Sequence, residues 1–249
     1  MSRLASLSTP SRSRSSLSPS PGPATVPVVA LPPIETTHHR MLRIVISEIK
    51  NLLRTWDDLV GVDGIKASKG VIDESTTMDN LLQVAETERT SMSTHLVRLH
   101  DQRAAMEAVL AKLGRLLAKL SLLVDQAEKI FFEACRLQGA AWVVEEPLWL
   151  SWTLDHFVNS IPPLISLHND HLASLTSLSR IILNPDTTFD DAKLALERWR
   201  DLSMAGTRHQ GVREWEELVD LELSAGGEDS SEEEEEKVVS SGRKKKGRK

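Results

Sequence analysis

Apolar residues recur at helical spacing where the middle part of the chain begins. Between residues 35 and 60 they follow one another alternately four and three positions apart, at Leu42, Ile46, Ile49, Leu53, Trp56 and Val60. This spacing gives an α-helix one apolar face. Thr36-Thr37 can cap the start of the helix, and Gly61 with Asp63-Gly64 predicts its end in a turn. Residues 61–75 are expected to form a loop.

The strongest pattern in the chain covers residues 76–138. Thr76-x-x-Asp79 resembles a capping box, with Asp in place of Glu. From Met78 the heptad a and d positions are apolar apart from two arginines, and they are Leu82, Ala85, Arg89, Met92, Leu96, Leu99, Arg103, Met106, Leu110, Leu113, Leu117, Leu120, Val124, Ala127, Phe131 and Ala134. A continuous helix of this length would measure roughly 85–90 Å. Its seam requires a partner helix, from this chain or from another.

The second half of this segment carries a further apolar stripe, spaced by seven residues, at Val109, Leu116, Leu123 and Ile130. Two adjacent apolar faces are typical of a helix inside a bundle, whereas a two-stranded coiled coil needs only one. We therefore expect the helix to begin as a slender coiled coil and to end inside a bundle. The candidate core or partner-binding residues at its centre are Leu113, Leu117 and Leu120.

Residues 147–223 predict a second helical module, which contains tryptophan. Its first helix is expected to begin between residues 151 and 153 and to continue to about Leu183. Pro162-Pro163 predicts a kink or a break within it, because an interior proline removes a backbone hydrogen bond. Asn184-Pro185 predicts its end.

Two further helices are expected in this module. Thr188-x-x-Asp191 can cap the first, whose apolar positions again follow heptad spacing. Gly206 and Gly211 bracket a break, and a short last helix covers residues 212–223. Because Leu and Ala supply most of the apolar surface, the predicted fold class is all-α, a helical bundle with a long heptad-repeat helix.

Both ends of the chain are predicted to be disordered tails. Residues 1–34 are rich in Ser and Pro, and they hold too little apolar surface to offset the entropy of ordering. Ser18 and Ser20 each precede proline and are candidate phosphosites. The absence of acids in this tail also fits a mitochondrial transit peptide, but its prolines oppose the amphipathic helix that such a peptide forms.

The tail at residues 224–249 is acidic and then basic. Ser230 and Ser231 lie in its acidic run and are further candidate phosphosites. The basic cluster is a candidate nuclear-import signal, and the alternative is a tail that only improves solubility. The members of this cluster are Arg243, Lys244, Lys245, Lys246, Arg248 and Lys249.

Composition narrows the class of protein. Residues 35–223 carry a net charge of −9, which argues against a nucleic-acid-binding surface in the folded part. A single cysteine, Cys135, excludes an intrachain disulfide and suits the nucleus or cytosol. No secretory signal and no run of about 18 apolar residues is present. We expect a nuclear protein that can also shuttle to the cytoplasm, and we expect that it does not enter a membrane.

The sequence shows no catalytic or phosphate-binding motif. His168 and His171 could face one way on a helix, but a zinc site needs three or four ligands, so we expect two solvated histidines. His38-His39 is a weaker metal candidate still. Adjacent carboxylates at 145–146 and 190–191 do not face each other on a helix. Cys135 is expected to be a small buried apolar residue. We expect no enzyme, no cofactor and no metal.

The six tryptophans are the most informative residues. Trp56, Trp152 and Trp199 are expected to be buried at bundle ends, with Phe157 close by. Trp142 and Trp149 lie in the segment between the long helix and the next, and one of them is a candidate for an exposed partner contact.

Two segments of this chain resemble the cyclin-dependent kinase 2-interacting protein family, in a divergent form of the fungal type. One is PLWLSWTLDHF (147–157) with the later Pro185-Asp186 and LERWRDL (196–202), and the other is IKNLLRTWDDLVGVDG (49–64). The matching residues are Pro147, Leu148, Trp152, Phe157, Pro185, Asp186 and Trp199, and in the early segment Trp56 and Leu59. The charged tails are not part of the pattern.

The resemblance implies a non-catalytic nuclear adaptor. Its partners would be a cyclin-dependent kinase or the subunits of an AAA ATPase complex, in DNA replication and checkpoint control and in maturation of the large ribosomal subunit. Apart from the resemblance, the heptad seam allows another coiled-coil chain as the partner, and the chain could then form a homo- or hetero-oligomer. The alternative reading is a structural coiled-coil subunit of a kinetochore or microtubule-associated complex, although a plain coiled coil does not need the tryptophan module.

Overall fold

The computed structural model describes residues 35–83 and 92–224. The predicted disorder of both tails therefore lies outside the described residues, apart from Ser224. The candidate phosphosites and the basic cluster also lie outside them.

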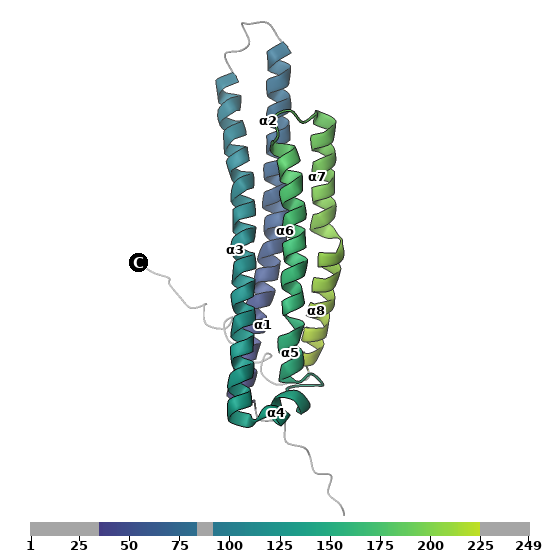
Figure 1. The fold of residues 1–249 in the computed structure, drawn as a ribbon. Helices are drawn as coiled ribbons and strands as arrows, with labels where there is room; N and C mark the ends of the chain where they lie inside the picture. The colour runs from purple at the N-terminus through teal and green to yellow at the C-terminus, as the bar shows by residue number, and fades with distance from the viewer. Residues whose placement is uncertain (1–34, 84–91, 225–249) are drawn as a thin grey trace, which may run out of the picture. The chain divides into compact units, whose positions relative to one another are not determined.

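The described part of the chain is all-α, as predicted. Its helices are α1 (Thr37–Asp58), the π-helical segment η1 (Leu59–Gly64), α2 (Ile65–Gln83), α3 (Met92–Gln138), α4 (Ala140–Glu145), α5 (Leu154–Ser160), α6 (Pro162–Leu183), α7 (Phe189–Met204) and α8 (Thr207–Ser224). The first rod is α1–η1–α2, the second is α3, the third is α5–α6 and the fourth is α7–α8, and these rods run side by side (Figure 1). None of the described helices combines the length and the hydropathy needed to cross a membrane.

The predicted loop at residues 61–75 is wrong, because the helix continues from α1 through η1 into α2. Trp199 of α7 explains the wide turn of η1: its indole nitrogen donates to the carbonyl of Val60, with a 3.1 Å separation. At Gly64 an added Cβ would stand 2.7 Å from the Trp199 ring, so glycine is needed for this packing. Burial of a tryptophan outweighs the roughly 1 kcal/mol by which each glycine disfavours a helix.

The predicted single helix over residues 76–138 is also wrong. α2 ends at Gln83 and α3 begins at Met92, and the two lie antiparallel. A hydrogen bond of 2.7 Å joins Glu74 to His95, and one of 3.4 Å joins Ser68 to Met106. Residue numbers therefore increase along α3 where they decrease along α2. In one straight helix, residues 74 and 95 would stand about 30 Å apart. The heptad seam therefore pairs within the chain.

The expected helix start at Thr76 fails for a local reason. Its hydroxyl donates to the carbonyl of Ile72 at 2.8 Å, inside α2. A threonine in a helix can make this bond four residues back as readily as it caps a start. A capping-box pattern alone therefore does not separate the two arrangements.

Half of the predicted seam on α3 is confirmed. One of its two lines begins at the half-buried Met92 and is then buried at Leu99, Met106, Leu113, Leu120, Ala127 and Ala134. On the other line Leu96 is exposed and Leu117 is only half-buried. The stripe noted as secondary supplies Val109, Leu123 and Ile130 to the core instead. The core face is rotated because two rods, α1–η1–α2 and α5–α6, rather than one, cover α3.

The C-terminal module follows the predicted helix order. The Thr153 hydroxyl caps α5, accepting from the His156 amide, and Pro162-Pro163 separates α5 from α6. The Thr188 side chain caps α7 in the same way. The predicted break between Gly206 and Gly211 is only partly right. Gly206 has a φ of 109°, but Gly211 lies inside α8, close against Leu167.

The core has two apolar clusters along the bundle. One lies at the end that holds α4 and the loop 146–153, where α1, α3, α5, α6 and α8 meet. We call this the closed end. The other joins α2, the first half of α3, the second half of α6 and α7. At that end α2 and α3 continue beyond the turn between α6 and α7 (Figure 1), and we call it the open end.

Candidate functional site

A buried polar network crosses the middle of the bundle. The side chain of Arg208 on α8 forms an ion pair with Asp57 on α1, and its Nε donates to Nε2 of His168 at 3.2 Å. The Trp56 indole donates to Nδ1 of His171 at 3.1 Å, and its ring meets the His168 ring edge-on at 4.7 Å. The expectation of two solvated histidines is therefore wrong, because both are buried.

The surroundings keep these histidines neutral. Burial, and then the charge of Arg208, lower the pKa of His168 to about 4. The same two causes, in the same order, lower the pKa of His171 to about 4. His168 Nδ1 lies 2.7 Å from the Leu164 carbonyl, so it carries the proton and Nε2 accepts from Arg208. In the described part of the chain, no three His, Cys, Asp or Glu side chains group as a metal site would require.

The closed end gathers the tryptophans of the connecting segment. Trp149 lies under the guanidinium of Arg43, at 5.5 Å from the ring centroid, and meets Phe157 edge-on. Trp142 lies near the rings of His38 and His39. Trp142, Trp149 and Trp152 are half-buried, whereas Trp56, Trp199 and Phe157 are fully buried. These residues therefore hold the fold together, and the three half-buried tryptophans keep part of their surface exposed at the closed end.

A carboxylate of α8 fixes the loop at the closed end. Glu222 accepts from the backbone amides of Ser151 and Trp152, at 2.9 and 3.0 Å, and from the Ser151 hydroxyl. Burial opposes its ionisation, but these hydrogen bonds outweigh burial and lower the pKa of Glu222. On the opposite side, His39 Nε2 donates to the Leu148 carbonyl at 2.8 Å. The loop is thus held from α1 and from α8.

The remaining sequence candidates are ordinary parts of the bundle. Leu113 and Leu120 are fully buried, and Leu117 is half-buried. Cys135, expected to be buried, is half-buried beside the closed-end cluster. The carboxylates at 145–146 and 190–191 are exposed. No opposed pair of acids is formed by them.

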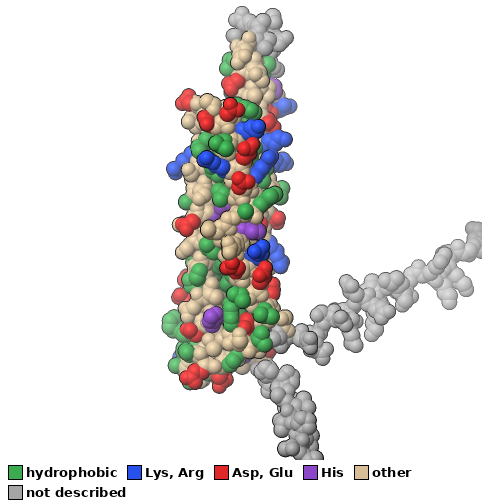
Figure 2. All heavy atoms as spheres, turned by 90° about the vertical axis from the view of Figure 1, so that its right-hand side faces the viewer, with side chains coloured by type: hydrophobic (Ala, Val, Ile, Leu, Met, Phe, Trp, Pro, Cys, Tyr) green, Lys and Arg blue, Asp and Glu red, His purple; other side chains and the backbone are tan. Residues whose placement is uncertain are grey.

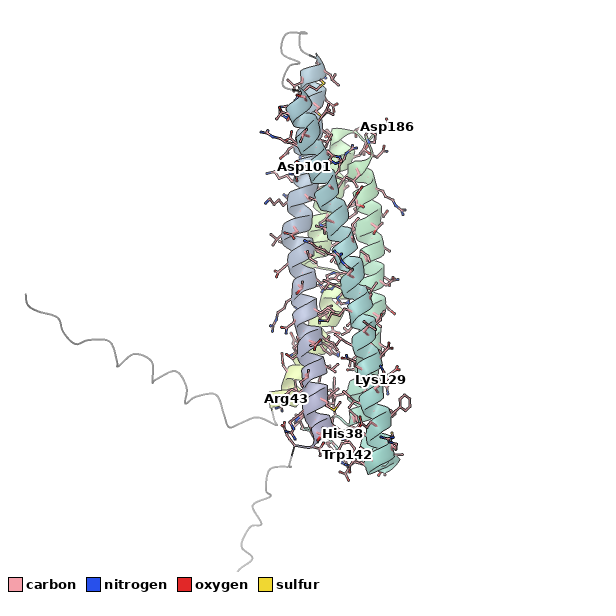
Figure 3. All side chains as sticks on the ribbon, turned by 90° about the vertical axis from the view of Figure 1, so that its left-hand side faces the viewer. His38, Arg43, Asp101, Lys129, Trp142 and Asp186 are labelled. Atoms are coloured by element: carbon pink, nitrogen blue, oxygen red, sulfur yellow. The ribbon has the colours of Figure 1, made fainter. Side chains whose placement is uncertain are left out.

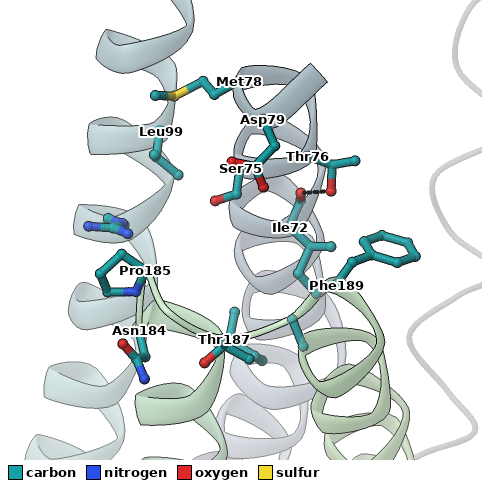
Figure 4. Close-up of a pocket in the computed structure, with 13 residues that line it drawn as sticks. Ile72, Ser75, Thr76, Met78, Asp79, Leu99, Asn184, Pro185, Thr187 and Phe189 are labelled. Carbon is teal, nitrogen blue, oxygen red and sulfur yellow. Dashed lines mark hydrogen bonds between the residues drawn. The ribbon is translucent and has the colours of Figure 1, made fainter. Parts of the chain in front are cut away.

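The open end has a recess of about 160 Å³ that sequence reasoning missed. It lies between α2, α3 and the α6–α7 turn. Ile72, Leu99 and Phe189 line it with apolar surface, and Ser75 and Asp79 add polar atoms (Figure 4). The recess lies where the third and fourth rods end, while the α2–α3 hairpin continues.

Arg103 of α3 also lines this recess. Its Nε is buried and has no hydrogen-bond partner within the described residues. A buried charged donor without a partner costs free energy, which a carboxylate or carbonyl oxygen in the recess would recover. In the sequence, Arg103 interrupts the apolar heptad pattern. This charged residue at a seam position was the signal from which the recess could have been predicted.

Exposed apolar side chains surround the recess. Leu82 of α2, Leu96 of α3 and Phe189 of α7 each leave about half of their surface open, at 54 %, 49 % and 53 %. Leu82 and Leu96 lie on the predicted seam, at the level where α6 and α7 no longer cover it. Leu218 and Leu221 of α8 are also exposed apolar residues. Hydrophobic side chains spread over the lower half of the face shown in Figure 2. A second recess, of about 330 Å³, lies between α6 and α7 and is lined by Ile181, Leu194 and Arg198 among others, but none of the described residues that line it holds a buried donor without a partner.

No family model matches the chain, and no curated protein matches it.

Proposed function

We propose that this chain is a non-catalytic adaptor, and that it holds a helical segment of a partner protein at the open end of its bundle. The observation that carries the proposal is the incomplete bundle: two helices continue past the ends of the other two rods, with Leu82 and Leu96 exposed on their seam. An amphipathic helix laid against these side chains would complete the bundle there. Such a helix uses anchors at i, i+3 or i+4, and i+7.

Arg103 gives the partner a second requirement. The segment should carry an acidic side chain, or a helix C-terminal carbonyl, that reaches the buried Nε. A recess that combines apolar walls with a buried arginine Nε without a partner resembles the centre of a protein interface, where arginine and aromatic residues dominate the binding energy. The exposed Phe189 at its rim is an aromatic residue of this kind.

The resemblance to the cyclin-dependent kinase 2-interacting protein family supports a choice of partner. We propose an AAA ATPase complex subunit or a cyclin-dependent kinase, met in the nucleus, in DNA replication and checkpoint control and in maturation of the large ribosomal subunit. The two segments that carry the resemblance meet in this fold: Trp199 packs on η1 and donates to Val60. A shared packing unit of this type is what a family would keep for its fold.

Affinity capture with variants tests the proposal. Full-length chain, Leu96→Asp and Phe189→Ser would serve as baits. Met204→Ser is the control, because it removes an even more exposed apolar side chain at the other end of α7. We expect the wild type and the control to recover an AAA ATPase or a cyclin-dependent kinase, and both open-end variants to lose it by about 10-fold or more. Equal recovery by all four baits would refute the open end as the binding site. Recovery of tubulin-associated or kinetochore proteins alone would favour the structural alternative.

Arg103 has its own test against the same purified partner. Arg103→Met keeps the apolar stem and removes the donors, whereas Arg103→Lys keeps the charge without the planar fork. The loss of a buried charged hydrogen bond costs about 2–5 kcal/mol, so Arg103→Met should weaken binding by about 30-fold or more, and Arg103→Lys should lie between it and the wild type. Unchanged affinity in Arg103→Met would show that the partner does not enter the recess.

A further inference from the structure

A groove lies between α1 and α3 near the closed end, on the side shown in Figure 3. It consists of two adjoining hollows of about 430 and 390 Å³ that share Met41 and Glu133. Val45 and Ile130 form the floor of one hollow. This groove is separate from the open end, where the proposed partner binds.

The walls of the groove are apolar and open to solvent. Ile44 of α1 is 60 % exposed, and Leu137 of α3 is 58 % exposed. Leu122, at 61 %, continues the same face of α3, because it precedes the groove residues Gln126 and Lys129 by four and seven positions. From Leu122 to Leu137 this face is about 22 Å long. That is enough for four turns of helix to lie against it.

Ion pairs cover the line between the first rod and α3 farther up, and the last of them is made by Glu48 at the edge of the groove. Lys119 pairs with Glu48 at 3.5 Å, and Lys112 pairs with Asp63 at 3.9 Å. On the wall of the groove itself, Lys129 and Glu133 form no ion pair with any described residue, although they are one turn apart. Lys followed by Glu four positions later is the less favourable order for a pair within one helix.

The charges of the groove form a pattern that is its own complement. When two copies of α3 lie antiparallel with their midpoint at residue 131, Lys129 of each copy faces Glu133 of the other. A two-fold interface requires this reciprocity, because residue i contacts residue j and j contacts i. A second copy of this chain supplies the matching charges at the required spacing.

We propose that the α1–α3 groove is the interface of a symmetric homodimer, with a second copy of this chain as its occupant. Two reciprocal Lys129–Glu133 pairs fix the register, and Ile44, Leu122 and Leu137 of each copy supply the apolar contact. The open end of each copy stays free, so the dimer presents two partner sites.

Charge reversal tests this inference on the full-length chain. Sedimentation or light scattering from about 1 to about 100 μM should give a mass of twice 27.7 kDa for the wild type. Lys129→Glu and Glu133→Lys should each weaken the dimer by about 10-fold or more, because like charges then face each other. The double variant with both changes should dimerise again. A mixture of the two single variants should form a heterodimer, in which every pair is opposite in sign.

The outcomes separate this proposal from others. A monomeric wild type over the whole range would overturn it, as would dimers of both single variants as stable as the wild type. Ile44→Asp should also give a monomer with unchanged helical circular dichroism, since Ile44 is largely exposed in the folded chain. Leu96→Asp should leave the dimer intact while it removes the proposed partner, so failure of one proposal is distinguishable from failure of the other. A dimer lost in Leu96→Asp and kept in Ile44→Asp would place self-association at the open end and contradict the groove.

Discussion

Acidification from pH 7 to pH 5 should destabilise this bundle through His168 and His171. Both have a pKa of about 4 in the folded chain, against 6.5 when unfolded. Between these two values the unfolded chain binds more protons than the folded one, so stability falls as pH falls. The contribution is fully present above pH 6.5 and is lost progressively down to pH 4. Stability changes with pH in the direction expected of a buried neutral histidine. A histidine whose charged form pairs with a carboxylate would give the opposite change.

The magnitude follows from the same values. One pKa unit corresponds to about 1.4 kcal/mol, and pH 5 lies about 1.5 units below the unfolded pKa of each histidine. Each histidine therefore lowers the free energy of unfolding by about 2 kcal/mol at pH 5. The two together lower it by about 4 kcal/mol when they titrate independently of each other. The total free energy of unfolding of a typical domain is about 5–15 kcal/mol, so this loss is large enough to measure.

Urea denaturation followed by circular dichroism at pH 7, 6 and 5 gives the free energy of unfolding at each pH. His171→Asn should be less stable than the wild type at pH 7 and should lose about 2 kcal/mol less on going to pH 5. His156→Asn, an exposed control, should keep the wild-type pH dependence. A wild-type loss below about 1 kcal/mol, or the same pH dependence in His171→Asn, would refute the reasoning.

Three further predictions concern two comparisons of packing and one hydrogen-bonded loop. Leu120→Ala should lower the free energy of unfolding by about 2–5 kcal/mol and Leu117→Ala by about 1 kcal/mol, because only Leu120 is fully buried. Equal losses in urea denaturation would contradict the rotated core face. Gly64→Ala should destabilise the chain by about 1–3 kcal/mol, since its Cβ would meet an indole ring at 2.7 Å, whereas Gly61→Ala, with open space around it, should be neutral or stabilise by up to about 1 kcal/mol; the reverse order of melting temperatures would disprove the packing at η1. Glu222→Gln should cost about 1–3 kcal/mol and speed hydrogen exchange at the amides of the closed-end loop, and unchanged exchange there would show that the carboxylate does not hold the loop.

Local patterns were sufficient for much of the fold. Helical spacing predicted the all-α class, and Thr153 and Thr188 cap the helices that follow them. Pro162-Pro163 marks the junction of α5 and α6 as expected. These features depend on residues within one or two turns of each other, and a sequence displays such neighbours directly.

The failures arise where a distant residue decides the local structure. Gly61 and Gly64 predict a helix end, but Trp199, 135 positions beyond Gly64, packs on Gly64 and stabilises a continuous π-helical turn. His168 is buried because Arg208, 40 positions later, occupies its Nε2. Sequence spacing carries no information on such contacts.

The heptad pattern could not show where its helix reverses. Both arms of the α2–α3 hairpin keep the seven-residue repeat, so the repeat runs on across residues 76–138 although α2 ends at Gln83. The open-end recess depends on this reversal together with the α6–α7 turn, and for that reason it appeared only in the structure. Arg103 interrupts the seam on α3 and Leu96 lies on it; in the fold the Nε of Arg103 is buried without a partner and Leu96 is exposed.

Hydrogen exchange on the full-length chain, with and without the purified AAA ATPase or cyclin-dependent kinase, tests the adaptor proposal most directly. The account predicts slower exchange on binding at residues 75–83, 92–103 and 184–192, the three segments around the open end, and little change at residues 41–48 and 122–137 of the α1–α3 groove. Protection confined to the closed end or to α8, or no protection in the described part of the chain, would contradict it.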